Sequence, residues 1–332
     1  MAYTAGDTIL DDEYNVFVTG NADGSANHAV ANVNSIWGTG DGDQGYGQTG
    51  TLSAVSAGSS ITATQWNNFL GRIETISAHQ GSTVTDYSSL TTSDSIDALS
   101  TVATDLATIK ANRLNAAALG SNVTAGGASS RSTAWAGQTG TQTVATTQTI
   151  TFSSEAHMES FFNSGGLLNM TFARSGGTSN NKNTEWSNLC TDMGTVTLSG
   201  SDSHTVSSTS YTGTTQTGGA VGGTGSAKST IDFHALTGSL QQLIIKYSDG
   251  APYTANYIKV QASKSGAVLT LTTTMVDDAA DTANPTHITV ANPYLLDQVD
   301  GTLTVTAVAV LPSETYLTNT WGTPTLATSE AL

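Results

Sequence analysis

The chain has 332 residues, and only 11% of them are charged, against about 25% in a typical globular domain. Its charge is acidic: 26 Asp and Glu residues oppose 10 Lys and Arg residues, which gives a formal net charge of −16. Such a chain lacks the surplus of basic side chains that displaces counterions from phosphates or attracts anionic lipids. We therefore expect neither nucleic-acid binding nor attachment to a charged membrane surface.

The remaining composition predicts a folded protein that is rich in β-structure and loops. Hydrophobic residues make up 37% and aromatic residues 7% of the chain, which is more than a disordered chain usually carries. The one cysteine, Cys190, excludes an intrachain disulfide, and a small buried side chain is its expected role. We expect no secretory signal, no membrane insertion and no cofactor, because no matching segment or motif is present.

Residues 1–85 are expected to form an N-terminal docking or assembly region with short helices. A first helix is predicted within residues 1–20, with Asp7 or Thr8 as its cap. A clearer helix follows Thr62 or Thr64 and ends at Gly81, and its apolar side chains recur at helical spacing. These apolar side chains are Trp66, Phe69, Ile73 and Ile76.

Residues 86–120 are expected to contain a second helical segment, capped by Ser93 or Asp94. Its apolar residues Leu99, Val102, Leu106 and Ile109 repeat in a coiled-coil-like spacing. Two interpretations stay open, because the repeat is shorter than the three or four heptads of a safe coiled-coil assignment. The helix either joins copies of the chain or lies on its own domain.

Residues 121–147 are rich in Gly, Ser, Thr and Ala and are predicted to be a linker. Residues 148–332 are predicted to form an antiparallel β-sandwich, with a division near residues 215–230 as an alternative. One predicted hairpin joins "LQQLIIKYSDG" to "NYIKVQAS", and "AVLTLTTTMVDD" alternates in a strand pattern. The expected fold class is therefore mainly β, with a smaller helical N-terminal part.

The stretch "SSEAHMESFFNSGG" predicts a short helix and a sharp turn between two strands. Phe161 and Phe162 would pack this helix on a sheet, while Gly165 and Gly166 permit the reversal. The flanking segments "TQTITFSS" and "LLNMTFAR" are expected to pair with each other. Nothing in this stretch suggests chemistry, so its predicted role is structural.

The sequence contains no local catalytic or metal-binding pattern. Asp41 and Asp43 in "GDGDQG" resemble a calcium loop only faintly and are expected to lie in a turn, and "VDDAAD" is expected to be a solvated acidic loop. The six histidines are scattered through the chain. A glycoside hydrolase needs two carboxylates across a cleft, and nothing in the sequence selects such a pair from the 26 acidic residues.

Several segments are similar to structural proteins of tailed bacteriophages, especially phages of marine cyanobacteria and related hosts. The strand ending in "TFSS", the segment "ESFFNSGG" and the strand ending in "RSGG" carry this resemblance. In that family a Trp-containing helix follows, and "NTEWSNLCTDMGTVTLS", with Trp186, resembles it. The N-terminal segments "NVNSIWGTG", "GYGQ" and "WNNFLGRIETISAHQG" are also similar to that family. Its members are called tail-fibre-like or virion structural proteins.

The resemblance implies a non-enzymatic virion component that is made in the host cytoplasm. A tail fibre, or an adaptor between tail and baseplate, is the first expectation. The alternatives are a capsid decoration or neck protein, a tail-borne polysaccharide depolymerase and a bacterial adhesin. The expected partners are further copies of the chain, as a trimer or ring, other virion proteins and a host surface glycan. The structural or assembly candidates are Trp66, Phe69, Leu99, Leu106, Phe161, Phe162, Gly165, Gly166 and Trp186.

Overall fold

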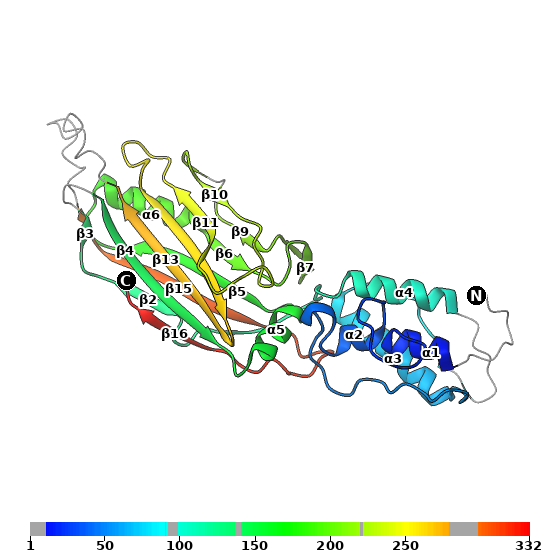
Figure 1. Cartoon of the computed structure of the whole chain (residues 1–332). Coiled ribbons are helices and arrows are strands. Elements are labelled where there is room, and N and C mark those ends of the chain that lie inside the picture. The colour runs from blue at the N-terminus through cyan, green and yellow to red at the C-terminus, as the bar shows by residue number, and fades with distance from the viewer. Residues whose placement is uncertain (1–10, 90, 92–98, 137–140, 220–221, 279–297) are drawn as a thin grey trace.

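A helical region and a β-sandwich lie end to end in the chain (Figure 1). The computed structural model describes residues 11–89, 91, 99–136, 141–219, 222–278 and 298–332. Over these residues the fold is mainly β, the sheets are antiparallel, and most helices lie in the N-terminal half. The predicted fold class is confirmed.

The helical region consists of short elements around one long helix. These elements are α1 (Asp11–Thr19), α2 (Val33–Trp37), the 3-10 turn η1 (Asp41–Asp43), α3 (Ala63–Gln80) and α4 (Leu99–Ala111). Thr62 and Gln65 form a reciprocal capping box at the start of α3, and Gly81 ends it in the left-handed conformation with φ 69°. The predicted bounds of this helix are confirmed. The caps predicted at Asp7 or Thr8 and at Ser93 or Asp94 lie outside the described residues.

Helix α4 packs on its own domain. Val102, Leu106 and Ile109 are at most 1% exposed and belong to the core that α3 also lines. Of the two interpretations of the apolar repeat, the structure therefore supports the second, in which the helix lies on its own domain. Leu99 is the first residue of α4, and its side chain lies outside the described part of the structure.

The sandwich is built from two six-stranded sheets. The first sheet contains β1 (Leu119–Val123), β2 (Ala128–Arg131), β15 (Thr302–Pro312), β5 (Leu167–Ser175), β6 (Thr195–Leu198) and β9 (Thr214–Gln216). The second sheet contains β10 (Ala227–Lys228), β11 (Gln241–Tyr247), β12 (Tyr257–Ser265), β13 (Val268–Asp277), β4 (Gln142–Thr151) and β16 (Thr325–Glu330). Two small pairs, β3 (Trp135–Ala136) with β14 (Gln298–Val299) and β7 (His204–Val206) with β8 (Thr209–Tyr211), complete the strands described.

The predicted hairpin of the second sheet is confirmed. Strands β11, β12 and β13 pair in sequence order, and β13 then pairs along its whole length with β4. In β13, Leu269, Leu271 and Met275 are buried while the threonines between them are partly exposed, apart from the buried Thr273. This alternation places one face of the strand in the core.

Helix α5 (Glu155–Asn163) moves the chain from one sheet to the other. Strand β4 precedes it in the second sheet, and β5 follows it in the first sheet. The expected pairing of "TQTITFSS" with "LLNMTFAR" is therefore wrong, because these strands lie in different sheets. Helix α6 (Asn181–Met193) follows β5 and contacts both β5 and β12, so its buried Trp186 and Leu189 are part of the common core.

The interpretation of residues 121–147 as a linker is wrong for the residues described there. They contribute to β1 and form β2, β3 and the first half of β4, and Ser129 and Trp135 are 3% and 7% exposed. Small Ser, Thr and Ala side chains pack closely in these strands, so a linker-like composition concealed sheet structure. The division near residues 215–230 is also not a domain boundary, because the chain crosses there from β9 to β10 within one sandwich.

Polar contacts bridge the two sheets on both sides of the sandwich. On one side, Lys228 Nζ donates to the carbonyl of Thr214 at 3.0 Å, and Thr214 Oγ1 donates to the carbonyl of Ile231 at 2.8 Å. On the other side, the backbone N–H of Leu332 donates to Ser129 Oγ at 3.0 Å. Such contacts cover edge strands, which would otherwise offer unpaired backbone groups to another chain.

Candidate functional site at the junction

The most elaborate polar structure lies where the helical region meets the sandwich. We call this contact the junction: it joins loop 38–50 of the helical region to helix α5 and loop 313–324 of the sandwich (Figure 1). Gly47 marks how closely the two sides approach, since a Cβ built on it would lie 2.0 Å from Ser160 Oγ of α5. Its φ of +65° also favours glycine.

Gln48 joins the helical region to loop 313–324. Its side-chain amide bonds both backbone groups of Thr318, as the backbone of a neighbouring β-strand would. Its Nε2 donates to the carbonyl of Thr318 at 2.9 Å, and its Oε1 accepts from the Thr318 N–H at 2.9 Å. The same Nε2 lies 2.9 Å from Thr320 Oγ1. Gln48 is only 5% exposed, so these bonds form away from competing water.

Asn163, at the end of α5, forms the second amide bridge. Its Nδ2 donates to the carbonyls of Asp43 at 2.6 Å and Gly45 at 2.8 Å. Its Oδ1 is then left to accept from His234 Nε2, which lies 2.9 Å away. Asn163 has no exposed surface, so one side chain connects the helical region, α5 and the chain near Phe233.

An isolated parallel β-bridge between Ala116 and Val206 adds a further contact to the junction. Ala116 N–H donates to the carbonyl of Thr205 at 3.0 Å, and Ser207 N–H donates to the carbonyl of Ala116 at 2.8 Å. Ala117 N–H donates in turn to the carbonyl of His79, the penultimate residue of α3, at 2.7 Å. The end of α3 is thereby connected to the sandwich through backbone hydrogen bonds.

Three histidines at or beside the junction are held neutral by burial. Burial lowers the pKa of His79, His204 and His234 from 6.5 to about 4 in each case. Lys264 and Arg113 lower the pKa of His234 further, and Asp43 opposes them. His79 also packs its ring against Tyr46 at 4.9 Å between centroids. Desolvation disfavours the charged imidazolium, so the junction is built around uncharged rings.

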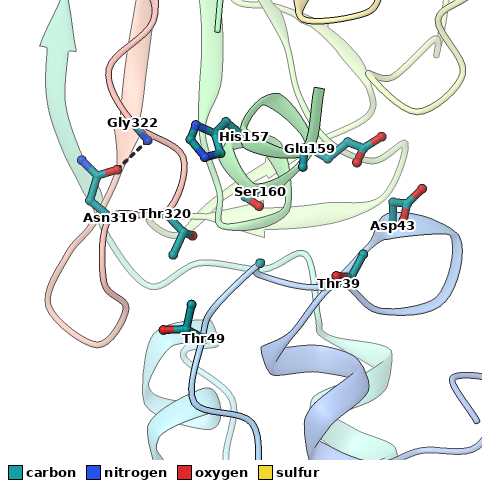
Figure 2. Close-up of a pocket in the computed structure, with 12 residues that line it drawn as sticks. Thr39, Asp43, Thr49, His157, Glu159, Ser160, Asn319, Thr320 and Gly322 are labelled. Carbon is teal, nitrogen blue, oxygen red and sulfur yellow. Dashed lines mark hydrogen bonds between the residues drawn. The ribbon is translucent and has the colours of Figure 1, made fainter. Parts of the chain in front are cut away.

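A cleft of about 430 Å³ opens beside the amide bridges (Figure 2). Two of its walls come from loop 38–50 and from α5, with the side chains of Thr39, Asp43, Thr49, His157, Glu159 and Ser160. The third wall is the turn of loop 313–324, where Asn319 Oδ1 accepts from the N–H of Gly322 at 2.7 Å. The cleft therefore brings together residues that lie more than a hundred positions apart in the sequence.

The electrostatic character of the cleft is acidic. Burial raises the pKa of Glu159, the nearby Asp43 adds to this rise, and Lys264 opposes it. None of the described residues that line the cleft is Lys or Arg. A bound anion would therefore meet two carboxylates and no compensating cation in the lining.

Neither a cluster of metal-ligating side chains nor a reactive thiol is present among the described residues. Among them, His, Cys, Asp and Glu side chains do not gather in groups of three or more that could hold a metal ion. Cys190 is 2% exposed, and burial raises the pKa of its thiol to about 12, which makes it the inert small side chain that was expected. The prediction that "VDDAAD" is a solvated loop is wrong for its Asp277. This side chain is 1% exposed and forms an ion pair with Lys182.

The aromatic candidates taken from the sequence, and Leu106, belong to the interior of the chain. Buried in the core, each at most 2% exposed, are Trp66, Phe69, Leu106, Phe161, Phe162 and Trp186. Phe162 stacks on Phe233 at 4.2 Å between ring centroids, and Trp186 meets Trp135 edge-on at 5.0 Å. These aromatic side chains stabilise the molecule itself and are not placed to contact another subunit.

Gly165 and Gly166 make the predicted turn after α5. Gly165 has a φ of +92°, and a Cβ built on Gly166 would lie 2.6 Å from the carbonyl oxygen of Phe161. The turn therefore requires glycine at both positions, for conformation at one and for space at the other. The predicted succession of strand, short helix, glycine turn and strand is confirmed.

Sequence reasoning missed the junction and its cleft. Gln48 and Asn163 are uncharged polar residues in a chain rich in such residues, and Gln48 meets Thr318 across 270 positions. A hint lies in the asparagine of "FFNSGG", because an asparagine that is followed by a glycine turn often bonds backbone groups.

Comparisons with protein-family models, with curated proteins and with solved structures gave no match to this chain. Within the described ranges, none of the helices has both the length and the apolar character needed to cross a bilayer.

Proposed function

We propose that the chain is a non-enzymatic structural component of a bacteriophage virion, a tail fibre or a tail/baseplate adaptor that acts by assembly and host attachment. The observation that carries this proposal is the junction. Gln48 and Asn163 connect a helical region to a β-sandwich through hydrogen bonds of buried side chains, and such bonds resist movement of one region against the other. A particle component that transmits force between neighbours needs such a connection.

The surface supports the same proposal. Charged residues are 11% of the chain, and the exposed large apolar side chains among the described residues are the separate Val30, Leu240 and Tyr316. The hydrogen bonds that bridge the two sheets at β2, β9 and β10 disfavour the addition of a foreign strand at these positions. Together with the resemblance of residues 1–200 to tailed-phage structural proteins, these features favour assembly through polar surfaces.

The proposed assembly is a homo-oligomer, a trimer or a ring, that also contacts other virion proteins. Light scattering after size exclusion, over a range of concentrations, measures the mass of the particle in solution. A discrete multiple of the 33.9 kDa chain is expected. A monomer at the highest concentration would contradict self-assembly, and absence of the chain from the proteins of purified particles would contradict the virion role.

A tail-borne polysaccharide depolymerase is a second candidate, because the cleft contains a pair of carboxylates. Glycoside hydrolysis uses one carboxyl group with a raised pKa as acid and a second carboxylate as base or nucleophile. Glu159 has such a raised pKa, and Asp43 lies near enough to contribute to it. Release of new reducing ends from host polysaccharide, lost in Glu159→Gln, is the result that this candidate requires.

A further inference from the structure

The cleft at the junction has a defined lining in which apolar surface is combined with a small number of polar groups. Its side chains carry hydroxyl groups from Thr39, Thr49, Ser160 and Thr320, together with the carboxylates of Asp43 and Glu159. Hydroxyl groups both donate and accept hydrogen bonds, while carboxylates accept them strongly. This combination complements a ligand that presents several hydroxyl groups on a compact ring.

The charge of the lining restricts the ligand further. The two carboxylates disfavour phosphate, sulfate or carboxylate groups, and the described lining residues include no Lys or Arg to offset this repulsion. A metal ion is also disfavoured, because no metal-binding group of His, Cys, Asp and Glu side chains exists among the described residues. A ligand without acidic groups therefore fits this lining better than an anion or a metal ion.

The wall of the cleft that loop 313–324 supplies is held by hydrogen bonds within the chain. Gln48 Nε2 lies 2.9 Å from Thr320 Oγ1, and Thr320 Oγ1 lies 3.2 Å from the carbonyl of Tyr46. Asn319 closes its own turn on Gly322. This wall is therefore ordered without a ligand, and binding costs little additional conformational entropy on the side of loop 313–324.

We propose that this cleft binds a neutral sugar residue of a polysaccharide, with Thr39, Thr49 and Glu159 as hydrogen-bonding partners of its hydroxyl groups. The proposal rests on the proposed function only for the origin of the sugar, which would be the host surface. The binding site itself follows from the lining and is tested on the isolated chain.

The test is binding of the full-length chain to a panel of neutral oligosaccharides built from hexoses, deoxyhexoses and N-acetylhexosamines, measured by saturation-transfer NMR. Uronic-acid oligosaccharides of equal length serve as the anionic probes. We expect at least one neutral oligosaccharide to bind and the anionic ones to bind at least about tenfold more weakly. Binding of no neutral oligosaccharide overturns the proposal, and so does equal binding of the anionic ones.

Two variants locate the site. The double variant Thr39→Val, Thr49→Val removes two hydroxyl groups with little change of shape and is expected to weaken neutral-sugar binding about tenfold or more. Glu159→Gln removes a charge and is expected to let the anionic oligosaccharides bind. The matched control Thr171→Val alters an exposed threonine of β5 and should leave binding unchanged.

Unchanged binding in the double variant, with an unchanged urea midpoint, would contradict this location. The failure of this proposal is distinguishable from failure of the virion role. A chain that is found in the tail but binds no sugar refutes the sugar site alone. A chain that binds sugar but is absent from particles refutes the virion role alone.

Discussion

Lys182 Nζ lies 2.9 Å from Asp277 Oδ2, and the two side chains are each only 2% exposed. This ion pair connects the first turn of α6 with the last residue of β13. The other carboxylate oxygen, Asp277 Oδ1, accepts from Asn256 Nδ2 at 2.8 Å. A charge pair in so buried a position is tolerated only when its remaining hydrogen-bonding capacity is also used.

Replacement of Lys182 by Met is therefore expected to destabilise the fold strongly. The change leaves Asp277 buried without its cation, which costs about 3 to 5 kcal/mol of the free energy of unfolding. Urea denaturation followed by circular dichroism measures the change. Lys259→Met is the matched control on the partly exposed side of β12 and should cost less than about 1 kcal/mol.

The double variant Lys182→Met, Asp277→Asn tests the cause of that loss. Because it removes both charges, its cost is expected to be smaller than the sum of the two single costs. Additive costs would show that the charges do not interact, contrary to the 2.9 Å contact.

Asn163→Ala is expected to loosen the junction. It removes the donor for the carbonyls of Asp43 and Gly45, and the buried Gly45 carbonyl, left without this partner, costs about 1 to 3 kcal/mol. Limited proteolysis should then cut loop 38–50 faster than in the unaltered chain. Asn122→Ala, at an exposed position of β1, is the control. Equal cutting of Asn163→Ala and Asn122→Ala would show that the amide bridge does not hold this loop.

Acid is expected to weaken the fold through its buried histidines. The pKa of His79, His204 and His234 is about 4 in the folded chain against 6.5 in the unfolded chain, so between these values the unfolded chain binds more protons. The free energy of unfolding therefore falls as the pH drops from about 6.5 to about 4 and levels off below. Each histidine contributes on the order of 3 kcal/mol at most.

His234→Gln isolates one histidine, because the glutamine amide can still donate to Asn163 Oδ1. Its loss of stability between pH 7 and pH 4 should be smaller than that of the unaltered chain. Glu159 and Asp232, whose pKa is raised by burial, act in the opposite direction and are unchanged in this comparison. His28→Gln changes a half-buried histidine away from the junction and is the control. The same pH dependence in His234→Gln and the unaltered chain would count against the prediction.

Gly166→Ala is expected to destabilise the turn after α5 by about 1 to 3 kcal/mol, because the new Cβ has no room. It would lie 2.6 Å from the carbonyl oxygen and ring of Phe161. Gly71→Ala is the control and is expected to change stability in the opposite direction. A Cβ on Gly71 meets nothing within 4 Å, and alanine stabilises helix α3 by up to about 1 kcal/mol relative to glycine. Thermal denaturation compares the two variants, and a midpoint for Gly166→Ala at or above that of the unaltered chain would refute the account of this turn.

Local patterns were sufficient to predict much of the fold. Helix α3 was identified from the spacing of Trp66, Phe69 and Ile73, since a capped amphipathic helix is specified by its own residues. The alternation in β13 and the turn at Asp249-Gly250 likewise identified a hairpin whose strands are close in sequence.

Long-range pairing was not contained in these patterns. Strand β4 alternates as clearly as β5, but no local feature says that its partners are β13 and β16 rather than β5. The cleft depends on three segments that meet only in the folded chain, and its lining consists of common polar residues. Burial of Gln48 and Asn163 is likewise a consequence of the tertiary fold.

Whether the chain lies at the tail of a bacteriophage particle, as proposed, tests the central claim most directly. Antibody against residues 200–332, detected by immunogold electron microscopy on intact particles, measures it. Gold at the distal tail or its appendages is the predicted result. Gold over the head or neck would contradict the tail assignment and support a capsid decoration or neck protein, and particles without gold, from a preparation in which the antibody recognises the isolated chain, would contradict the virion role.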